Sequence, residues 1–171
     1  MKQIIGNKYL KVFKFLSSQE VSEFLNNQKT RNILSLDETF GDNYFCYVCH
    51  HSLTSEKQFV LFFSSDENED NLSFLFWEEH KMFVLDTGKN VYLINEELNI
   101  IASFEITTPL IGLYLVNKDN LLLLEEAFFS LVDFEGKTIK NELFDLIEDF
   151  SIENGRLSIQ TSEENKIFEL A

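Results

Sequence analysis

The sequence predicts a mainly β protein, a β-rich α+β chain of antiparallel hairpins and meanders with one N-terminal helix. Aromatic and β-branched residues recur in short apolar runs, for example at 59–63 and 72–77. Polar residues and glycine separate these runs, as at 66–71 and 87–90, which is typical of strands joined by turns. The 18 Phe residues supply apolar surface for the core of such a protein.

One segment near the start has a helical pattern instead. Ser17 is a favoured N-cap residue and Glu20 places an acid in the first turn. The apolar residues that follow fall on one helical face: Val21, Phe24 and Leu25. We therefore expect a helix over 17–27, preceded by a strand over 8–16.

Apolar residues repeat at a fixed interval in the second half of the chain. Phe83, Leu121 and Ile159 follow one another at intervals of 38 residues. The same interval relates further positions: Val91, Phe129 and Ile167; Leu93 and Leu131; Ile94 and Val132; Asn95 and Asp133. One interval holds four strand-like runs, at 82–86, 90–95, 99–106 and 110–116. This is the size of a propeller blade, so we expect an incomplete set of blades, with a plain run of meander hairpins as the alternative.

Charge is distributed unevenly along the chain. There are 14 Lys and Arg against 29 Asp and Glu, a formal net charge of −15, and the acidic excess lies in residues 41–171. Such a charge repels nucleic acid and anionic membranes and attracts basic proteins. We expect a basic protein partner, no nucleic-acid partner and no membrane partner; the alternative is that the acidity serves only solubility.

The chain is expected to be a single cytoplasmic domain over 1–171. No apolar run approaches the roughly 20 residues of a membrane span, and charged residues interrupt the start too early for a secretory signal. Within this domain we expect an N-terminal strand-helix-strand part at 1–60 and antiparallel β repeats at 61–171.

The segment 121–137 has a pattern of its own. An apolar strand ending in Glu125 precedes a second strand, which leads into Asp133, Gly136 and Lys137. This pattern resembles small acidic β-rich bacterial proteins with propeller-blade-like strand repeats, some of which are toxin immunity proteins. The resemblance covers residues 81–171, and it implies a blade-like fold and binding to a toxin.

Cysteine and histidine cluster in the first half. The thiols of Cys46 and Cys49, followed by His50, match the spacing of c-type haem attachment, and together with His51 and His80 they would make four zinc ligands. The surrounding run reads as a strand, however, where residues three apart point to opposite faces. We therefore expect two buried thiols, no metal, no redox dithiol and no cofactor.

His80 is the main candidate for a general base. An acid in the segment 77–80 would orient its imidazole for catalysis; the alternative is a residue at a hairpin edge in contact with Trp77. The sequence has no glycine-flanked serine nucleophile and no phosphate-binding glycine motif. We expect no enzymatic activity.

Acidic runs are the strongest functional signal. The candidate partner-binding residues are Asp66, Glu67, Glu69, Asp70, Trp77, Glu78, Glu79, Glu125, Glu126, Asp145, Glu148 and Asp149. The first run lacks the spacing of a calcium loop, and solvated turns are the plain alternative. If the acids lie at turns and strand ends, several would converge on one rim. Their aromatic neighbours would be either anchors for the partner or part of the core: Phe76, Trp77, Phe128, Phe144 and Phe150.

These patterns predict a non-enzymatic acidic binding protein. We expect an immunity-type protein that neutralises a basic toxin such as a nuclease, whose phosphate-binding groove is cationic. The alternative is a structural or scaffold β protein that self-associates or pairs through its strand edges.

Overall fold

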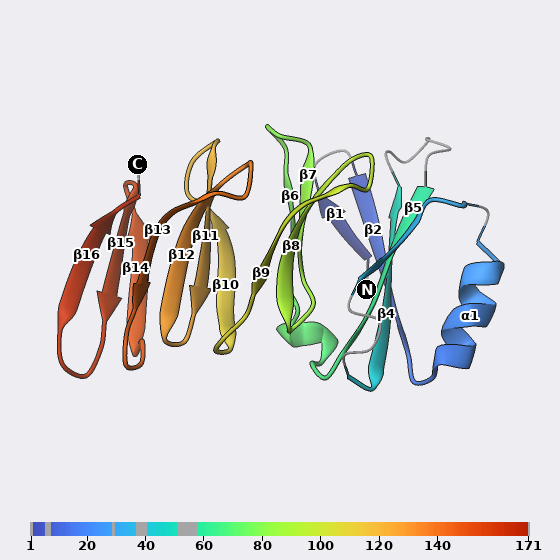
Figure 1. Cartoon of the computed structure of the whole chain (residues 1–171), viewed down its shortest axis with the longest axis horizontal. Helices are drawn as coiled ribbons and strands as arrows, with labels where there is room; N and C mark the ends of the chain where they lie inside the picture. Colours follow the sequence, from blue (N-terminus) through green and yellow to red (C-terminus); the bar gives the residue numbers. More distant parts are fainter. Residues whose placement is uncertain (1, 6–7, 29, 37–40, 51–57, 171) are drawn as a thin grey trace.

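Four β-sheets lie side by side in a computed structural model of the chain, and one helix covers the outer side of the first sheet (Figure 1). The structure describes residues 2–5, 8–28, 30–36, 41–50 and 58–170. Within these ranges, no helix has the length and apolarity needed to cross a bilayer.

The first sheet has five strands in the order β1-β2-β4-β5-β3. Its strands are β1 (Lys2–Ile5), β2 (Lys8–Phe15), β3 (Ile33–Leu36), β4 (Asn43–His50) and β5 (Gln58–Ser65). Strand β3 runs parallel to β5, whereas the other neighbours are antiparallel.

The second and third sheets are antiparallel meanders of four strands. The second contains β6 (Phe74–Trp77), β7 (Met82–Asp86), β8 (Asn90–Asn95) and β9 (Ile100–Glu105). The third contains β10 (Leu110–Leu115), β11 (Asn120–Glu125), β12 (Phe128–Asp133) and β13 (Thr138–Leu143). A short 3-10 helix, η1 (Glu69–Asn71), precedes β6.

The fourth sheet has three antiparallel strands, β14 (Asp149–Glu153), β15 (Arg156–Gln160) and β16 (Asn165–Glu169). Asn154 and Gly155 both have positive φ in the β14–β15 turn, as a tight hairpin turn requires. These sheets confirm the prediction of a mainly β protein with blade-like antiparallel repeats and one N-terminal helix.

The helix α1 (Ser18–Asn26) forms where its capping residues predict. The hydroxyl of Ser17 accepts a hydrogen bond from the backbone N–H of Glu20 at 3.3 Å. The Glu20 carboxylate accepts a hydrogen bond from the N–H of Leu16 at 3.0 Å, so both side chains tie the first turn to the preceding backbone. Val21 is buried against the first sheet, with Phe24 and Leu25 partly buried beside it.

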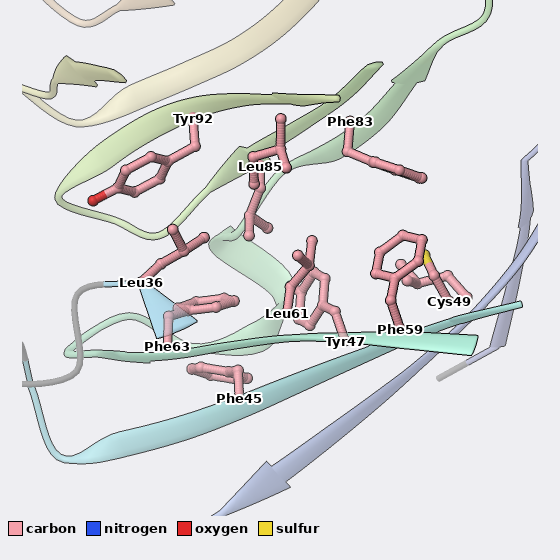
Figure 2. Close-up of a cluster of buried hydrophobic side chains, with 12 residues drawn as sticks. Leu36, Phe45, Tyr47, Cys49, Phe59, Leu61, Phe63, Phe83, Leu85 and Tyr92 are labelled. Carbon is pink, nitrogen blue, oxygen red and sulfur yellow. The ribbon is translucent and has the colours of Figure 1, made fainter. Parts of the chain in front are cut away.

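Apolar side chains fill the space between each pair of neighbouring sheets. On β7, Phe83 and Leu85 face the first sheet, in the cluster that Figure 2 shows, whereas Met82 and Val84 pack with residues of the third sheet. The two middle sheets are thus buried on both faces, which explains why their central strands are continuous apolar runs rather than alternating ones.

The 38-residue interval corresponds to the step from one sheet to the next. Phe83, Leu121 and Ile159 occupy β7, β11 and β15, and each packs against the preceding sheet. Val91 and Phe129 pack against the following sheet, whereas the equivalent Ile167 on the fourth sheet is 70 % exposed.

The same interval also repeats a turn. The Asp133 carboxylate accepts hydrogen bonds from the backbone N–H groups of Glu135 and Lys137. In the second sheet, Asn95 Oδ1 accepts hydrogen bonds from the equivalent N–H groups, those of Glu97 and Asn99. Gly136 has φ of 80°, and the equivalent Leu98 also has positive φ. A Cβ on Gly136 would lie 2.2 Å from the Cβ of Ala102 on β9, so the second and third sheets are in close contact there.

Replacing Gly136 with Ala is therefore expected to destabilise the fold more than replacing Gly155. Both glycines have positive φ, which costs an L-residue about 1 kcal/mol. Only Gly136 has atoms within 4 Å of the added methyl group, and overpacking there costs a further ~1–3 kcal/mol. Urea unfolding of the two variants measures the difference, and equal losses of stability would contradict the close packing of the two sheets.

Candidate acidic binding rim

The links between strands gather at the two ends of the sheets, because successive strands run in opposite directions. One end carries the β5–β6, β7–β8, β9–β10, β11–β12, β13–β14 and β15–β16 links; we call it the lower rim, as it lies at the bottom of Figure 1. The opposite end, the upper rim, carries the β6–β7, β8–β9, β10–β11, β12–β13 and β14–β15 links.

Most of the predicted acidic residues lie on the lower rim. They are Asp66, Glu67, Glu69, Asp70, Glu125, Glu126, Asp145, Glu148 and Asp149. Glu163 and Glu164 in the β15–β16 turn extend this group, and neither was among the predicted residues. Glu78 and Glu79 are exposed in the β6–β7 turn on the upper rim, so the structure separates this predicted pair from the others.

Glu125 is buried rather than available for contact. Its Oε2 accepts hydrogen bonds from the backbone N–H groups of Thr107 and Thr108, at 2.8 and 2.7 Å, and from both hydroxyls. These bonds fix the β9–β10 link against the end of β11. The neighbouring Glu126 is exposed, so of this predicted pair only Glu126 presents its carboxylate to solvent.

Trp77 is also excluded from the contact surface, because its side chain is fully buried. Its indole N–H donates a hydrogen bond to the carbonyl oxygen of Lys118 at 2.8 Å, which links the second sheet to the β10–β11 turn. Phe144 is buried between the third and fourth sheets, and Phe76, Phe128 and Phe150 are partly buried. The aromatic neighbours of the acidic runs are thus mainly part of the core.

A cavity of about 710 Å³ opens among the links of the lower rim. One group of lining residues is acidic, Glu67, Asp70 and Asp86, and comes from the β5–β6 link and the end of β7. The β9–β10 link and the start of β10 supply a second group of lining residues, which includes Ile106 and Leu110. The cavity therefore combines carboxylates with apolar side chains.

Asp86 was not predicted as a site residue, and it is 2 % exposed. Its Oδ1 accepts a hydrogen bond from the N–H of Gly88 at 2.7 Å and its Oδ2 accepts one from Ser73 at 3.3 Å. Burial raises the pKa of Asp86 to about 6, the two backbone hydrogen bonds oppose this shift, and the nearby Glu67 adds to it. The one sequence signal for this residue is its place between a buried strand and the Thr87-Gly88 turn.

The two cysteines lie on opposite faces of β4, as predicted. Cys46 packs under α1 and Cys49 packs in the cluster between the first and second sheets. Burial raises the pKa of the Cys46 thiol to about 12, which keeps it protonated and unreactive at neutral pH. Within the described residues, no group of three or more His, Cys, Asp and Glu side chains is placed to hold a metal ion; His51 lies outside them.

His80 lies at a hairpin edge, and its ring contacts Trp77 edge-on, with the ring centroids 5.1 Å apart. Its Nε2 is 3.2 Å from the Asp119 carboxylate, so the acid beside the imidazole comes from the β10–β11 turn rather than from the neighbouring glutamates. The ring also stacks on Phe134 at 4.1 Å. His80 thus connects three links of the upper rim.

Comparison with solved structures identifies the type of fold. BamB from Moraxella catarrhalis superimposes with a TM-score of 0.52 and 7 % identity over 81 % of this chain and 50 % of that chain. Hsv2 from Kluyveromyces marxianus gives a TM-score of 0.44 and 10 % identity over 78 % of this chain and 47 % of that chain. BamB is a propeller protein, and the four stacked sheets of this chain fit an incomplete set of propeller blades.

This likeness concerns the fold alone. The chain spans about a third to a half of the length of the solved structures that it matches. No protein-family model matches the sequence, and no curated protein sequence matches it either.

The raised pKa of Asp86 predicts a pH-dependent difference in stability between the protein and its Asp86→Asn variant. Because the folded state binds the Asp86 proton more tightly than the unfolded state, this group's contribution to stability falls as pH rises from about 4 to about 6. The variant cannot ionise there. Its stability relative to the parent should therefore rise by about 2 kcal/mol between pH 4 and pH 7.

Urea unfolding at several pH values measures this change. Asp66→Asn is the matched control, since it removes one exposed charge from the same rim. If Asp86→Asn and Asp66→Asn gave the same pH profile, the burial cost assigned to the Asp86 carboxylate would be wrong.

Proposed function

We propose that the chain is a non-enzymatic binding protein that docks a basic protein partner on its lower rim. The observation that carries this proposal is the convergence of the acidic links from three sheets at one end of the stack. The described bases on these links and at the adjoining strand ends are Lys89 and Lys166. Lys166 pairs with Glu142 and Glu164, at 3.1 and 2.9 Å. Its single positive charge is therefore shared by these two carboxylates and leaves the other acids of the lower rim without compensation from it.

An acidic end of this kind steers a basic partner during association. Charges of one sign concentrated on one surface raise association rates toward 10⁸–10⁹ M⁻¹s⁻¹ at low salt, and added salt removes this gain. The partner class that fits is a toxin domain with a cationic groove, such as a nuclease, and the chain would then act as an immunity-type protein. The resemblance over residues 81–171 supports the same class.

The absence of catalysis is part of the proposal. The Cys46 thiol stays protonated at neutral pH, and the His80 ring is held by a carboxylate and two aromatic rings. Neither group is placed beside the cavity of the lower rim, whose described lining includes three carboxylates but no His or Cys.

One observation favours the scaffold alternative. The β8–β9 and β12–β13 pairs contain register shifts next to the edge strands β9 and β13, whereas β15 and β16 pair in unbroken register. A regular edge strand such as β16 is suited to pairing with another chain. Two copies of a chain with a net charge of −15 repel each other, so self-association would strengthen with salt.

Association kinetics with a catalytically inactive basic nuclease toxin domain test the proposal. The matched variants are Glu126→Gln/Glu148→Gln on the lower rim and Glu78→Gln/Glu79→Gln on the upper rim, since all four side chains are exposed. We expect the association rate to fall at least about tenfold between 25 and 500 mM salt. At low salt, the lower-rim pair should slow association several-fold more than the upper-rim pair.

Two outcomes would contradict docking on the lower rim: equal effects of the two pairs, or an association rate independent of salt. Self-association that increases with salt, measured by size-exclusion chromatography of the chain alone, would favour the scaffold alternative.

A further inference from the structure

Two leucines on the lower rim are exposed although each has a buried apolar residue next to it in the chain. Leu143, at the end of β13, is 73 % exposed, and Leu146, in the β13–β14 link, is 52 % exposed. Phe144, which follows Leu143, and Ile147, which follows Leu146, are buried in the core between the third and fourth sheets. The link therefore anchors itself with two apolar side chains and leaves two others in solvent.

The backbone that carries these leucines is held in place. The N–H of Phe144 donates a hydrogen bond to the backbone carbonyl oxygen of Ala127 at 2.8 Å, and the N–H of Ile147 donates one to the backbone carbonyl oxygen of Glu126 at 2.7 Å. Both bonds tie the link to the β11–β12 turn. A partner that covered Leu143 and Leu146 would therefore not have to order this link first, which reduces the entropic cost of binding.

A hollow of about 180 Å³ lies beside Leu143, between the end of the third sheet and the β15–β16 turn. Its other lining residues are Phe144, Asp145, Thr161, Glu163 and Glu164. The hydroxyl of Thr161 accepts hydrogen bonds from the N–H groups of Glu163 and Glu164, which fixes this wall of the hollow. Apolar and acidic side chains thus meet at one fixed site.

Among the described residues, more acids than bases surround this site. Lys166 pairs with Glu142 and Glu164 and lies 5.5 Å from the centre of the Phe144 ring. Within the described part of the chain, four further acids around the leucines form no ion pair: Asp145, Glu148, Asp149 and Glu163. Exposed apolar side chains within an uncompensated acidic surface fit a ligand that is both cationic and apolar.

We propose that Leu143, Leu146 and the adjoining hollow are the apolar anchor point for a basic segment of a protein partner, in which Lys or Arg side chains stand next to a large apolar side chain. This proposal rests on the proposed function, because it locates the anchor within the same acidic rim. The carboxylates would set the rate of encounter, and the leucines would slow dissociation.

Two synthetic peptides of equal length and charge test the anchor, one alternating Lys with Leu and the other alternating Lys with Ser. The variant Leu143→Thr/Leu146→Thr removes the apolar contact. The matched control is Ile139→Thr/Ile167→Thr, because these side chains are 52 % and 70 % exposed but lie on β13 and β16 away from the hollow. Thermal unfolding of both variants checks that each remains folded.

We expect the parent chain to bind the Lys/Leu peptide about tenfold more tightly than the Lys/Ser peptide in fluorescence anisotropy at low salt. The leucine variant should lose this preference, and the isoleucine control should keep it. If the leucine variant kept the preference, or if the control lost it equally, the proposed apolar anchor would be contradicted. Salt-dependent binding of the Lys/Ser peptide would in that case still support docking on the acidic rim. If neither peptide bound the parent chain, both the anchor and the proposed function would be contradicted.

Discussion

Burial of both faces of the middle sheets is the constraint on which the structure depends. Met82 and Phe83 are adjacent on β7, yet they pack in different clusters on opposite sides of the second sheet, so this sheet needs a neighbour on each face. The stack is closed by two different means. Helix α1 covers the first sheet. On the outer face of the fourth sheet, Gln160 and Glu169 are exposed. The equivalent residues of the third sheet, 38 positions earlier, are the buried Leu122 and Leu131. The polar side chains of Gln160 and Glu169 allow the outer face of the fourth sheet to contact water.

This stacking also determines where a partner has room to bind. Because most faces of the sheets are covered by neighbouring sheets or by the helix, side chains from several sheets are exposed together mainly at the ends of the strands. The links of the lower rim combine exposed acids, a cavity and the two exposed leucines, Leu143 and Leu146. The links of the upper rim are used differently, since His80, Trp77 and Asp119 connect one sheet to the next there.

Local patterns in the sequence predicted the repeat but not the burial of polar groups. The 38-residue interval and the cap of α1 depend on strand and helix periodicity, which a sequence shows directly. Burial of Glu125 and Asp86 depends on backbone N–H donors from other segments, Thr107 and Thr108 for Glu125 and Ser73 for Asp86, and the sequence does not show which donors come near. The burial of Trp77 depends on how the β6–β7 hairpin meets the third sheet, which is again a tertiary contact. The opposite orientations of Cys46 and Cys49 could be predicted because they follow from strand geometry alone.

The most direct measurement of where a partner docks is amide hydrogen exchange of the chain with and without the inactive basic toxin domain. Docking on the lower rim predicts slower exchange in the bound state at 66–72 and 144–149, with little change at 78–81 on the upper rim. Protection confined to 78–81, or to the edge strand β16, would contradict an acidic docking surface at the lower ends of the sheets.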